Sequence, residues 1–473
     1  MNKPAPKSPR RSFLKAAGVG LAALPLAPAL PAMASDAAAP GATTAASPGV
    51  RPGVQAGVQL NVRDFGAIGD GKAKDTLAIQ QALDRCTLLG GGEVLVPAGT
   101  YLTGTIAIGS NTLLRLHEQA TLQGSPDLAD YTLTQVRWEG RWIKGYAGLV
   151  VAMRAENIGI AGAGKILGNT AIKGRVDRAT QLRHPALLEF TSCRNVQVRD
   201  CYTQQNDMWS IHPVYCDNVS FQNMTVNGAA DGIDVDSCRQ VVIEHCAFDT
   251  ADDCISLKSG RGLEGNTLAR PTEDVRIAHC SFRDHNWACI GIGSETSGGI
   301  RRVRVEHCQC LSAKTFAIYI KSRPGRGAFI EDIVMDDIDV AGAQGGFLRF
   351  NILNSGKQDE FPVPGEDGIP SIRNFHFSNI RVKDVPVLVD GVSIHPSKPL
   401  VGFSLTNISG TCGKGIALAN IKNAVLRGID VRGFSGPLLS TSNVSGTGLD
   451  GAVALAPPVL EPMLQPVAPY VLR

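Results

Sequence analysis

The chain has 473 residues, 44% of them hydrophobic, and a formal net charge of +3 at pH 7. This length and apolar fraction allow a large buried core and exclude a wholly disordered protein. Residues 1–34 contain five lysines and arginines and no acid, so the rest of the chain carries 41 − 43 = −2. That balance excludes a basic protein that coats nucleic acid, and we expect no nucleic-acid partner.

The first 34 residues contain the three parts of an export signal. Arg10 and Arg11 form a pair, an apolar stretch begins at Ala16, and Ala32-Met33-Ala34 follows as a cleavage site. Paired arginines indicate the twin-arginine export machinery as a partner. The alternative is a transmembrane anchor, which three prolines and the modest length of the stretch disfavour. We therefore expect a periplasmic or secreted protein with no stable membrane association.

Residues 35–58 are rich in alanine, proline and glycine, and we expect them to be a flexible lead-in to a single domain at residues 59–473. Near the start of this domain, Asp75 and Thr76 precede a helix-period apolar pattern that ends at Cys86. This pattern predicts an N-capped amphipathic helix that covers one end of the fold. Three glycines at 90–92 end the helix, and a strand is predicted at 93–96.

A short alternation of polar and apolar residues then recurs along the chain. Successive copies are 22 to 42 residues apart, with strands and turns between them. Such repeats are typical of an all-β solenoid, a right-handed parallel β-helix in which each coil buries its apolar face against the next. A β-sandwich is the alternative, but it needs more short hairpins. The copies begin at Arg194, Asp217, Arg239, Glu273, Arg302, Glu331 and Arg373.

Twelve cysteines follow the same rhythm. Cys193 and Cys201 flank one repeat exactly as far apart as Cys238 and Cys246 flank another. Equivalent positions on successive coils would stack in the interior, which favours buried free thiols. Disulfides remain the alternative for an exported protein. A zinc site is disfavoured because Cys308 and Cys310 have no second pair at ligand spacing.

Acidic residues gather in one stretch. Asp231 and Asp252 are 21 residues apart, about one coil, and Asp253 follows directly. Strands on neighbouring coils lie about 4.8 Å apart, so we expect these three carboxylates to share one patch. Like charges at such distances favour a proton on at least one of them, which suits acid/base hydrolysis of a glycosidic bond. The alternatives are a solvated acidic turn or a calcium site.

Five motifs occur in the order found in glycoside hydrolase family 28, the polygalacturonase family, and the chain resembles that family over residues 60–430. The resemblance implies a parallel β-helix that hydrolyses pectic polysaccharides or oligosaccharides with inversion, without a metal or other cofactor. The motifs are Trp209-Ser-Ile-His212-Pro213, Asp231-Gly-Ile-Asp234, Asp252-Asp253-Cys-Ile, Ile292–Gly299 and Ile320-Lys321-Ser322.

The resemblance also assigns roles. Asp252 is expected to be the general acid, while Asp231 and Asp253 activate the attacking water. Inverting enzymes keep roughly 6.5–9.5 Å between acid and base. Lys321 is expected to pair with a uronate carboxylate of the substrate. The other expected substrate-binding residues are Lys258, Arg326, His212 and Trp209. Trp138, Trp142 and Tyr146 are expected either to stack on sugars or to pack in the core.

The chain departs from the family pattern at four positions. Ala230 and Ala251 stand where an asparagine and a glycine are usual. Trp287 stands at the position of a histidine, and we expect either Trp287 or His285, two residues earlier, to contact substrate. Tyr319 replaces the arginine before Ile320 and Lys321. We therefore expect hydrolysis to be retained, with a rhamnogalacturonan, a xylogalacturonan or short oligosaccharides favoured as substrates over simple polygalacturonate.

Two other functions fit a β-helix with an acidic patch. One is a calcium-dependent pectic polysaccharide lyase, and the other is a non-catalytic β-helix that binds carbohydrate. The motifs do not distinguish cleavage inside a chain from cleavage at its end. That choice depends on loops such as 351–370, whose composition indicates an insertion.

Overall fold

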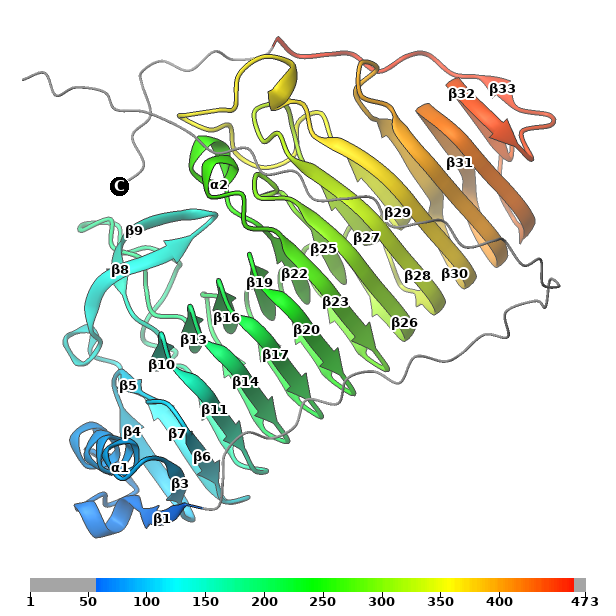
Figure 1. Cartoon of the computed structure of the whole chain (residues 1–473). Helices are drawn as coiled ribbons and strands as arrows, with labels where there is room; N and C mark the ends of the chain where they lie inside the picture. Colours follow the sequence, from blue (N-terminus) through cyan, green and yellow to red (C-terminus); the bar gives the residue numbers. More distant parts are fainter. Residues whose placement is uncertain (1–56, 463–473) are drawn as a thin grey trace, which may run out of the picture. The chain divides into compact units, whose positions relative to one another are not determined.

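The computed structural model describes residues 57–462. In this part of the chain, 31 strands join in one continuous sheet wound into successive coils, and two more strands form an antiparallel hairpin. The strands of the coils pair in parallel with those of the coil before and the coil after (Figure 1). The structure is therefore the all-β parallel β-helix that the repeats predict.

Most coils contribute one strand to each of three stacks. We call the first the site stack because the acidic residues lie on it. It contains β5 (Ile106–Ala107), β10 (Val150–Met153), β13 (Leu188–Thr191), β16 (Ile211–Val214), β19 (Ile233–Asp236), β22 (Ile255–Lys258), β25 (Ile290–Ile292), β27 (Phe316–Lys321) and β29 (Gly346–Asn351).

The second stack contains β1 (Val58–Asn61), β3 (Gly92–Val96), β6 (Thr112–Leu116), β11 (Glu156–Ala161), β14 (Arg194–Arg199), β17 (Asp217–Gln222), β20 (Arg239–Glu244), β23 (Thr272–Ala278), β26 (Ile300–Ser312), β28 (Phe329–Ala341), β30 (Ser371–Ser393) and β31 (Leu400–Arg432). The third contains β2 (Asp70–Lys74), β4 (Gly99–Thr103), β7 (Ala120–Gly124), β12 (Lys165–Leu167), β15 (Tyr202–Gln205), β18 (Thr225–Gly228), β21 (Ala247–Thr250) and β24 (Ser281–Asp284). The last coils end in β32 (Leu439–Thr447) and β33 (Val453–Ala454), and short 3-10 turns lie at Val62–Phe65, Leu128–Asp130 and Glu366–Gly368.

The repeated alternation places equivalent side chains in register. Val196 pairs with Val219, which pairs with Val241, and all three are buried. The residue before each of the first two valines, Asn195 and Asn218, has a positive φ and turns the chain at the corner. The side-chain amide of Asn218 donates to Asn195 across the coils at 2.8 Å. Asparagine tolerates this left-handed backbone better than most residues, which explains its place in the repeat.

All twelve cysteines lie within the described residues, and all are buried free thiols. The backbone N–H of Cys193 donates to the sulfur of Cys216, and that of Cys216 donates to the sulfur of Cys238. The predicted interior ladder of free cysteines is therefore confirmed. Disulfides, the alternative, do not form among them.

The predicted N-terminal helix is α1 (Thr76–Leu88), which packs against the first coils. The predicted side-chain cap is wrong, because the Asp75 carboxylate accepts from the backbone amides of Ile68 and Gly69 instead of capping the helix. Within residues 57–462, no helix is both long and apolar enough to cross a bilayer. The predicted export signal at 1–34 and nearly all of the predicted lead-in lie outside the described residues.

Two elements on the site stack were not predicted. They are the antiparallel hairpin of β8 (Leu133–Trp138) and β9 (Arg141–Tyr146), and the short helix α2 (Gly262–Leu268) that follows β22. Figure 1 shows the hairpin reaching from the N-terminal coils toward α2. Arg137 on β8 makes this contact, donating to Glu264 on α2 at 2.5 Å.

Candidate active site

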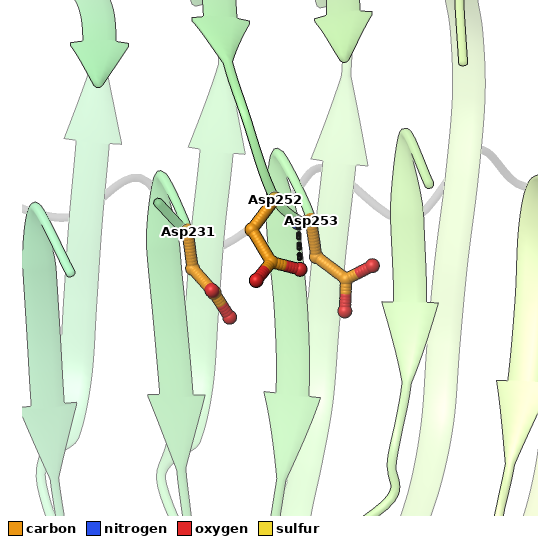
Figure 2. A group of neighbouring side chains, drawn as sticks. All are labelled: Asp231, Asp252 and Asp253. Carbon is orange, nitrogen blue, oxygen red and sulfur yellow. Dashed lines mark hydrogen bonds between the residues drawn. The ribbon is translucent and has the colours of Figure 1, made fainter. Parts of the chain in front are cut away.

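Three carboxylates meet where two neighbouring strands of the site stack begin. Asp231 lies just before β19, and Asp252 and Asp253 lie just before β22, the strand that pairs with β19. Figure 2 shows the three side chains side by side over these strands. One carboxylate oxygen from each lies within 4.8 Å of the others. The backbone N–H of Asp253 donates to Asp252 at 3.1 Å.

Three cations contact the carboxylates directly. The Lys258 ammonium bridges Asp231, at 3.3 Å, and Asp234. Lys321 pairs with Asp253. Calcium binds through six to eight oxygen ligands and is repelled by neighbouring cations, so these contacts disfavour the calcium site considered above.

The third cation is Arg175, whose guanidinium donates to Asp252 at 2.5 Å. It belongs to the loop at 168–187, between β12 and β13. Sequence reasoning missed this residue, since no motif surrounds it. The only signal is the length of the loop, which is far longer than the turns between most strands.

The surroundings shift the pKa values of two of these carboxylates in opposite directions. Burial raises the pKa of Asp253 to about 6; Lys321 opposes this shift, and the charges of Asp252 and Asp231 add to it. Burial also disfavours the charged form of Asp231, but Lys258 and Arg175 outweigh it and lower the pKa of Asp231. Between about pH 4 and pH 6 the cluster therefore holds a protonated Asp253 beside an ionised Asp231, so neighbouring carboxyl groups differ in charge.

Two further acids surround this group. Burial and the neighbouring Asp231 charge raise the pKa of Asp234 well above its usual range. Burial also raises the pKa of Asp284 to about 7, and one of its oxygens accepts from the backbone N–H of Trp287. Asp284 has no place in the five motifs and was missed from the sequence.

The nearest oxygens of the three carboxylates lie closer together than expected for an inverting enzyme. They lie within 4.8 Å of one another. That is closer than the roughly 6.5–9.5 Å between carboxyl groups that seats an attacking water in inverting enzymes. The stereochemical outcome therefore does not follow from carboxylate spacing.

Trp209 and His212 lie beneath the surface. The Trp209 ring is buried between the Trp138 ring, 4.5 Å away, and the Lys258 ammonium, 3.9 Å away. His212 is buried at 3.8 Å from Glu189, and burial lowers its pKa. Because both rings are buried, neither is accessible to a sugar in this arrangement, and the expectation that they contact substrate is not met. Trp209 packs against Lys258, and His212 packs against Trp209 at 5.0 Å between ring centroids.

Of the aromatic residues expected either to stack on sugars or to pack in the core, Trp138 and Tyr146 pack against buried clusters, whereas Trp142 is only partly buried and lines a pocket. Trp138 packs on Trp209, and Trp142 packs on Tyr215 at 6.2 Å between ring centroids. Tyr146 is partly buried against the main core.

Arg326 is also wrong as a free substrate-binding cation. Its side chain is 1% exposed and pairs with the buried Asp359. It also donates to the backbone carbonyls of Ser294 and Lys357. The residue therefore holds the loop at 352–370 in place.

An open aromatic surface lies beyond the acids. Trp287 is 38% exposed and stacks with Tyr319 at 6.0 Å between ring centroids. The Lys321 ammonium lies 5.8 Å from both rings. His285 instead follows the end of β24 and pairs with the exposed Asp249 at 2.6 Å. Trp287, not His285, adjoins the acidic group.

With this geometry in view, the comparisons with known proteins decide the family. The model of glycosyl hydrolases family 28 matches residues 86–348, more than half of the chain. The chain belongs to this family. It is therefore a glycoside hydrolase.

Individual relatives are moderately similar. A probable polygalacturonase of Vitis vinifera is 27% identical over 364 residues, covering 73% of each protein. An exo-poly-alpha-D-galacturonosidase of Dickeya chrysanthemi is 26% identical over 328 residues, covering 58% of this chain and 54% of that enzyme. The crystal structure of a hyperthermoactive exopolygalacturonase from Thermotoga maritima superposes with a TM-score of 0.69 at 24% identity, covering 79% of this chain and 94% of that one. This likeness shows the fold.

This family 28 chain has a side wall made of the β8–β9 hairpin, α2 and the loop at 352–370. Asp359 on the loop accepts from Arg141 at 3.0 Å and from Arg261 at 2.9 Å, in addition to Arg326. Glu139, at the tip of the hairpin, pairs with Lys357 on the loop at 2.8 Å. These ion pairs connect the hairpin, the start of α2 and the loop at 352–370, which are far apart in the sequence.

The wall covers one end of the site stack, whereas Trp287 and Arg349, beyond the acids, are partly exposed. Outward-facing residues in register run from Glu189 and His212, before the acids, to Tyr319 and Arg349 beyond them. Glu189 and His212 are buried, and the backbone of the hairpin strand β9 bridges to Arg183 beside Glu189. Beyond the acids the surface is accessible at Trp287. The acids therefore lie next to the covered end.

Proposed function

We propose that this protein is an exported hydrolase that removes galacturonate-containing units from the ends of pectic polysaccharides or oligosaccharides by single-displacement, inverting chemistry. The observation that carries the proposal is the carboxylate group with its three cations, beside the covered end of the site stack. Polygalacturonases among the relatives support a pectic substrate.

The acids have distinct roles in the reaction. Asp252 donates a proton to the glycosidic oxygen as the bond from that oxygen to the anomeric carbon breaks. A water oxygen bonds to the anomeric carbon from the opposite face and loses a proton to Asp231, with Asp253 beside it. One water is consumed, and the leaving sugar departs as an alcohol. Lys321 pairs with a uronate carboxylate of the substrate, because a charged hydrogen-bond donor suits a carboxylate.

The side wall supports attack at a chain end. Trp138 on the hairpin contacts Trp209, which contacts Lys258, which binds Asp231, so the wall is only two side chains away from the acids. A polymer therefore cannot continue past the acids on that side. The partly exposed Trp287 ring, which stacks on the buried Tyr319, extends the site on the other side and takes the sugars of the leaving chain.

The test is a time course of products from polygalacturonate and from rhamnogalacturonan, xylogalacturonan and short galacturonides. The proposal predicts products of one or two sugars from the first minutes and a slow fall in viscosity. A ladder of intermediate lengths with a rapid fall in viscosity would show internal cleavage. NMR of the first product tests inversion, and a retained anomer would contradict the single displacement.

Export and domain organisation remain proposals from the sequence. We infer that residues 1–34 are a twin-arginine signal followed by a lead-in at 35–58 and one domain at 59–473. Replacing Arg10 and Arg11 by lysine should leave the protein in the cytoplasm, which cell fractionation measures. Unchanged export of that variant would exclude the twin-arginine route.

A further inference from the structure

Arg175 is the cation of the site that solvent reaches most easily. Its side chain is 37% exposed and that of Asp252 is 27% exposed, whereas Lys258 and Lys321 are buried. A guanidinium has five N–H donors, and Asp252 is the only recorded acceptor for this one within residues 57–462. Most of its donors therefore remain available to a ligand.

The backbone around Arg175 is held firmly although the side chain is accessible. The N–H of Gly174 donates to Asp207 at 2.6 Å, and its carbonyl lies 2.9 Å from the His184 ring nitrogen. The backbone N–H of His184 donates to the Arg175 carbonyl at 3.0 Å. The backbone of the loop thus holds Arg175 in place beside the acids. The guanidinium can change its partner by a movement of the side chain alone.

The contact with Asp252 conflicts with the role of Asp252 as the acid. One oxygen of Asp252 accepts from Arg175 at 2.5 Å, and the other accepts from the backbone N–H of Asp253 at 3.1 Å. A general acid must present an oxygen that carries a proton to the glycosidic oxygen. If Arg175 leaves, the Asp252 oxygen that it occupies becomes available.

We propose that Arg175 binds the carboxylate of the uronate next to the scissile bond, and that by moving onto it Arg175 frees an oxygen of Asp252 to face the glycosidic oxygen. The inference rests on the proposed function and deepens it. A neutral or esterified sugar offers no anion in exchange, so Arg175 stays on Asp252 and keeps that oxygen occupied. The charge of the substrate thereby determines whether Asp252 is free to act.

The experiment compares Arg175→Gln and Arg175→Lys with Arg178→Gln, a change at an exposed arginine of the same loop. Each protein is assayed on an oligogalacturonide and on its methyl ester. Arg175→Gln is expected to lower kcat/KM for the free acid about 10- to 100-fold, the range for a hydrogen bond to a charged group. Activity on the ester should be unchanged or higher, Arg175→Lys should restore part of the preference, and Arg178→Gln should behave as wild type.

The comparison of acid with ester separates this role from a structural one. A merely structural role of Arg175 would lower kcat/KM equally on both substrates, and lysine would not restore the preference for the free acid. Equal losses on acid and ester would overturn the inference.

A binding measurement tests the inference even if the proposed function is wrong. Should the wild type cleave no pectic oligomer, the proposed function is wrong, and calorimetry with galacturonate and galactose decides the inference alone. A preference for galacturonate that Arg175→Gln abolishes would support it. Equal binding of the two sugars, or a preference that survives in the variant, would refute it.

Discussion

Replacing Asp253 by asparagine should change how the stability of the protein depends on pH. The pKa of Asp253 is raised from 3.8 to about 6 in the folded protein, mainly by burial. A raised carboxyl pKa means that the folded state binds the proton more tightly, so its stabilising contribution is complete below pH 3.8 and is lost as the pH rises through 6. The difference of about 2 pKa units corresponds to about 3 kcal/mol in total, of which about 2 kcal/mol falls between pH 4 and pH 7.

Asparagine does not titrate, so this loss should be absent from the variant. We expect the free energy of unfolding of Asp253→Asn, relative to wild type, to rise by about 2 kcal/mol from pH 4 to pH 7. Urea unfolding at the two pH values measures it, with Asp430→Asn as the control because that side chain is 74% exposed. A relative stability that stays constant, or that falls with pH, would refute the electrostatic reasoning for the site.

Two substitutions and one labelling measurement test the side wall, the aromatic surface and the cysteine ladder. Asp359→Asn leaves buried arginines without their carboxylate and should cost about 3–5 kcal/mol; it should also lengthen the products by loosening the side wall, while the more exposed Asp339→Asn should do neither. Trp287→Ala should raise KM for oligosaccharides about fivefold with little change in kcat, as expected for about 1 kcal/mol of stacking; a loss confined to kcat would contradict a sugar-stacking role. Cys216 and the other buried thiols should resist alkylation in the native protein and react after unfolding, and rapid native labelling would contradict the interior ladder.

The coils could be predicted from the sequence because they repeat. The alternation around Val196, Val219 and Val241 recurs at a nearly constant step, so the register of neighbouring coils follows from counting. The same counting brings Asp231 beside Asp252, since each precedes a strand of the same stack. Where the position of a site residue depends on the coil period, it could be predicted from the sequence alone.

The surroundings of the acids do not repeat, and there the predictions were least complete. Arg326 resembles a free cation in the sequence, but Asp359, on a loop of irregular length, pairs with it. Arg175 lies 77 residues from Asp252, and only the folded loop brings the two together. Such pairings depend on long-range geometry that neither periodicity nor spacing encodes.

The most direct test of the central claim is the chemistry of the product that wild type and Asp252→Asn release from polygalacturonate in the presence of a chelator. The account predicts that wild type produces new reducing ends without unsaturated sugars and that Asp252→Asn loses this activity by orders of magnitude. Unsaturated products, or activity that disappears with the chelator, would indicate a calcium-dependent lyase. Full activity of Asp252→Asn would contradict the catalytic role of the three carboxylates.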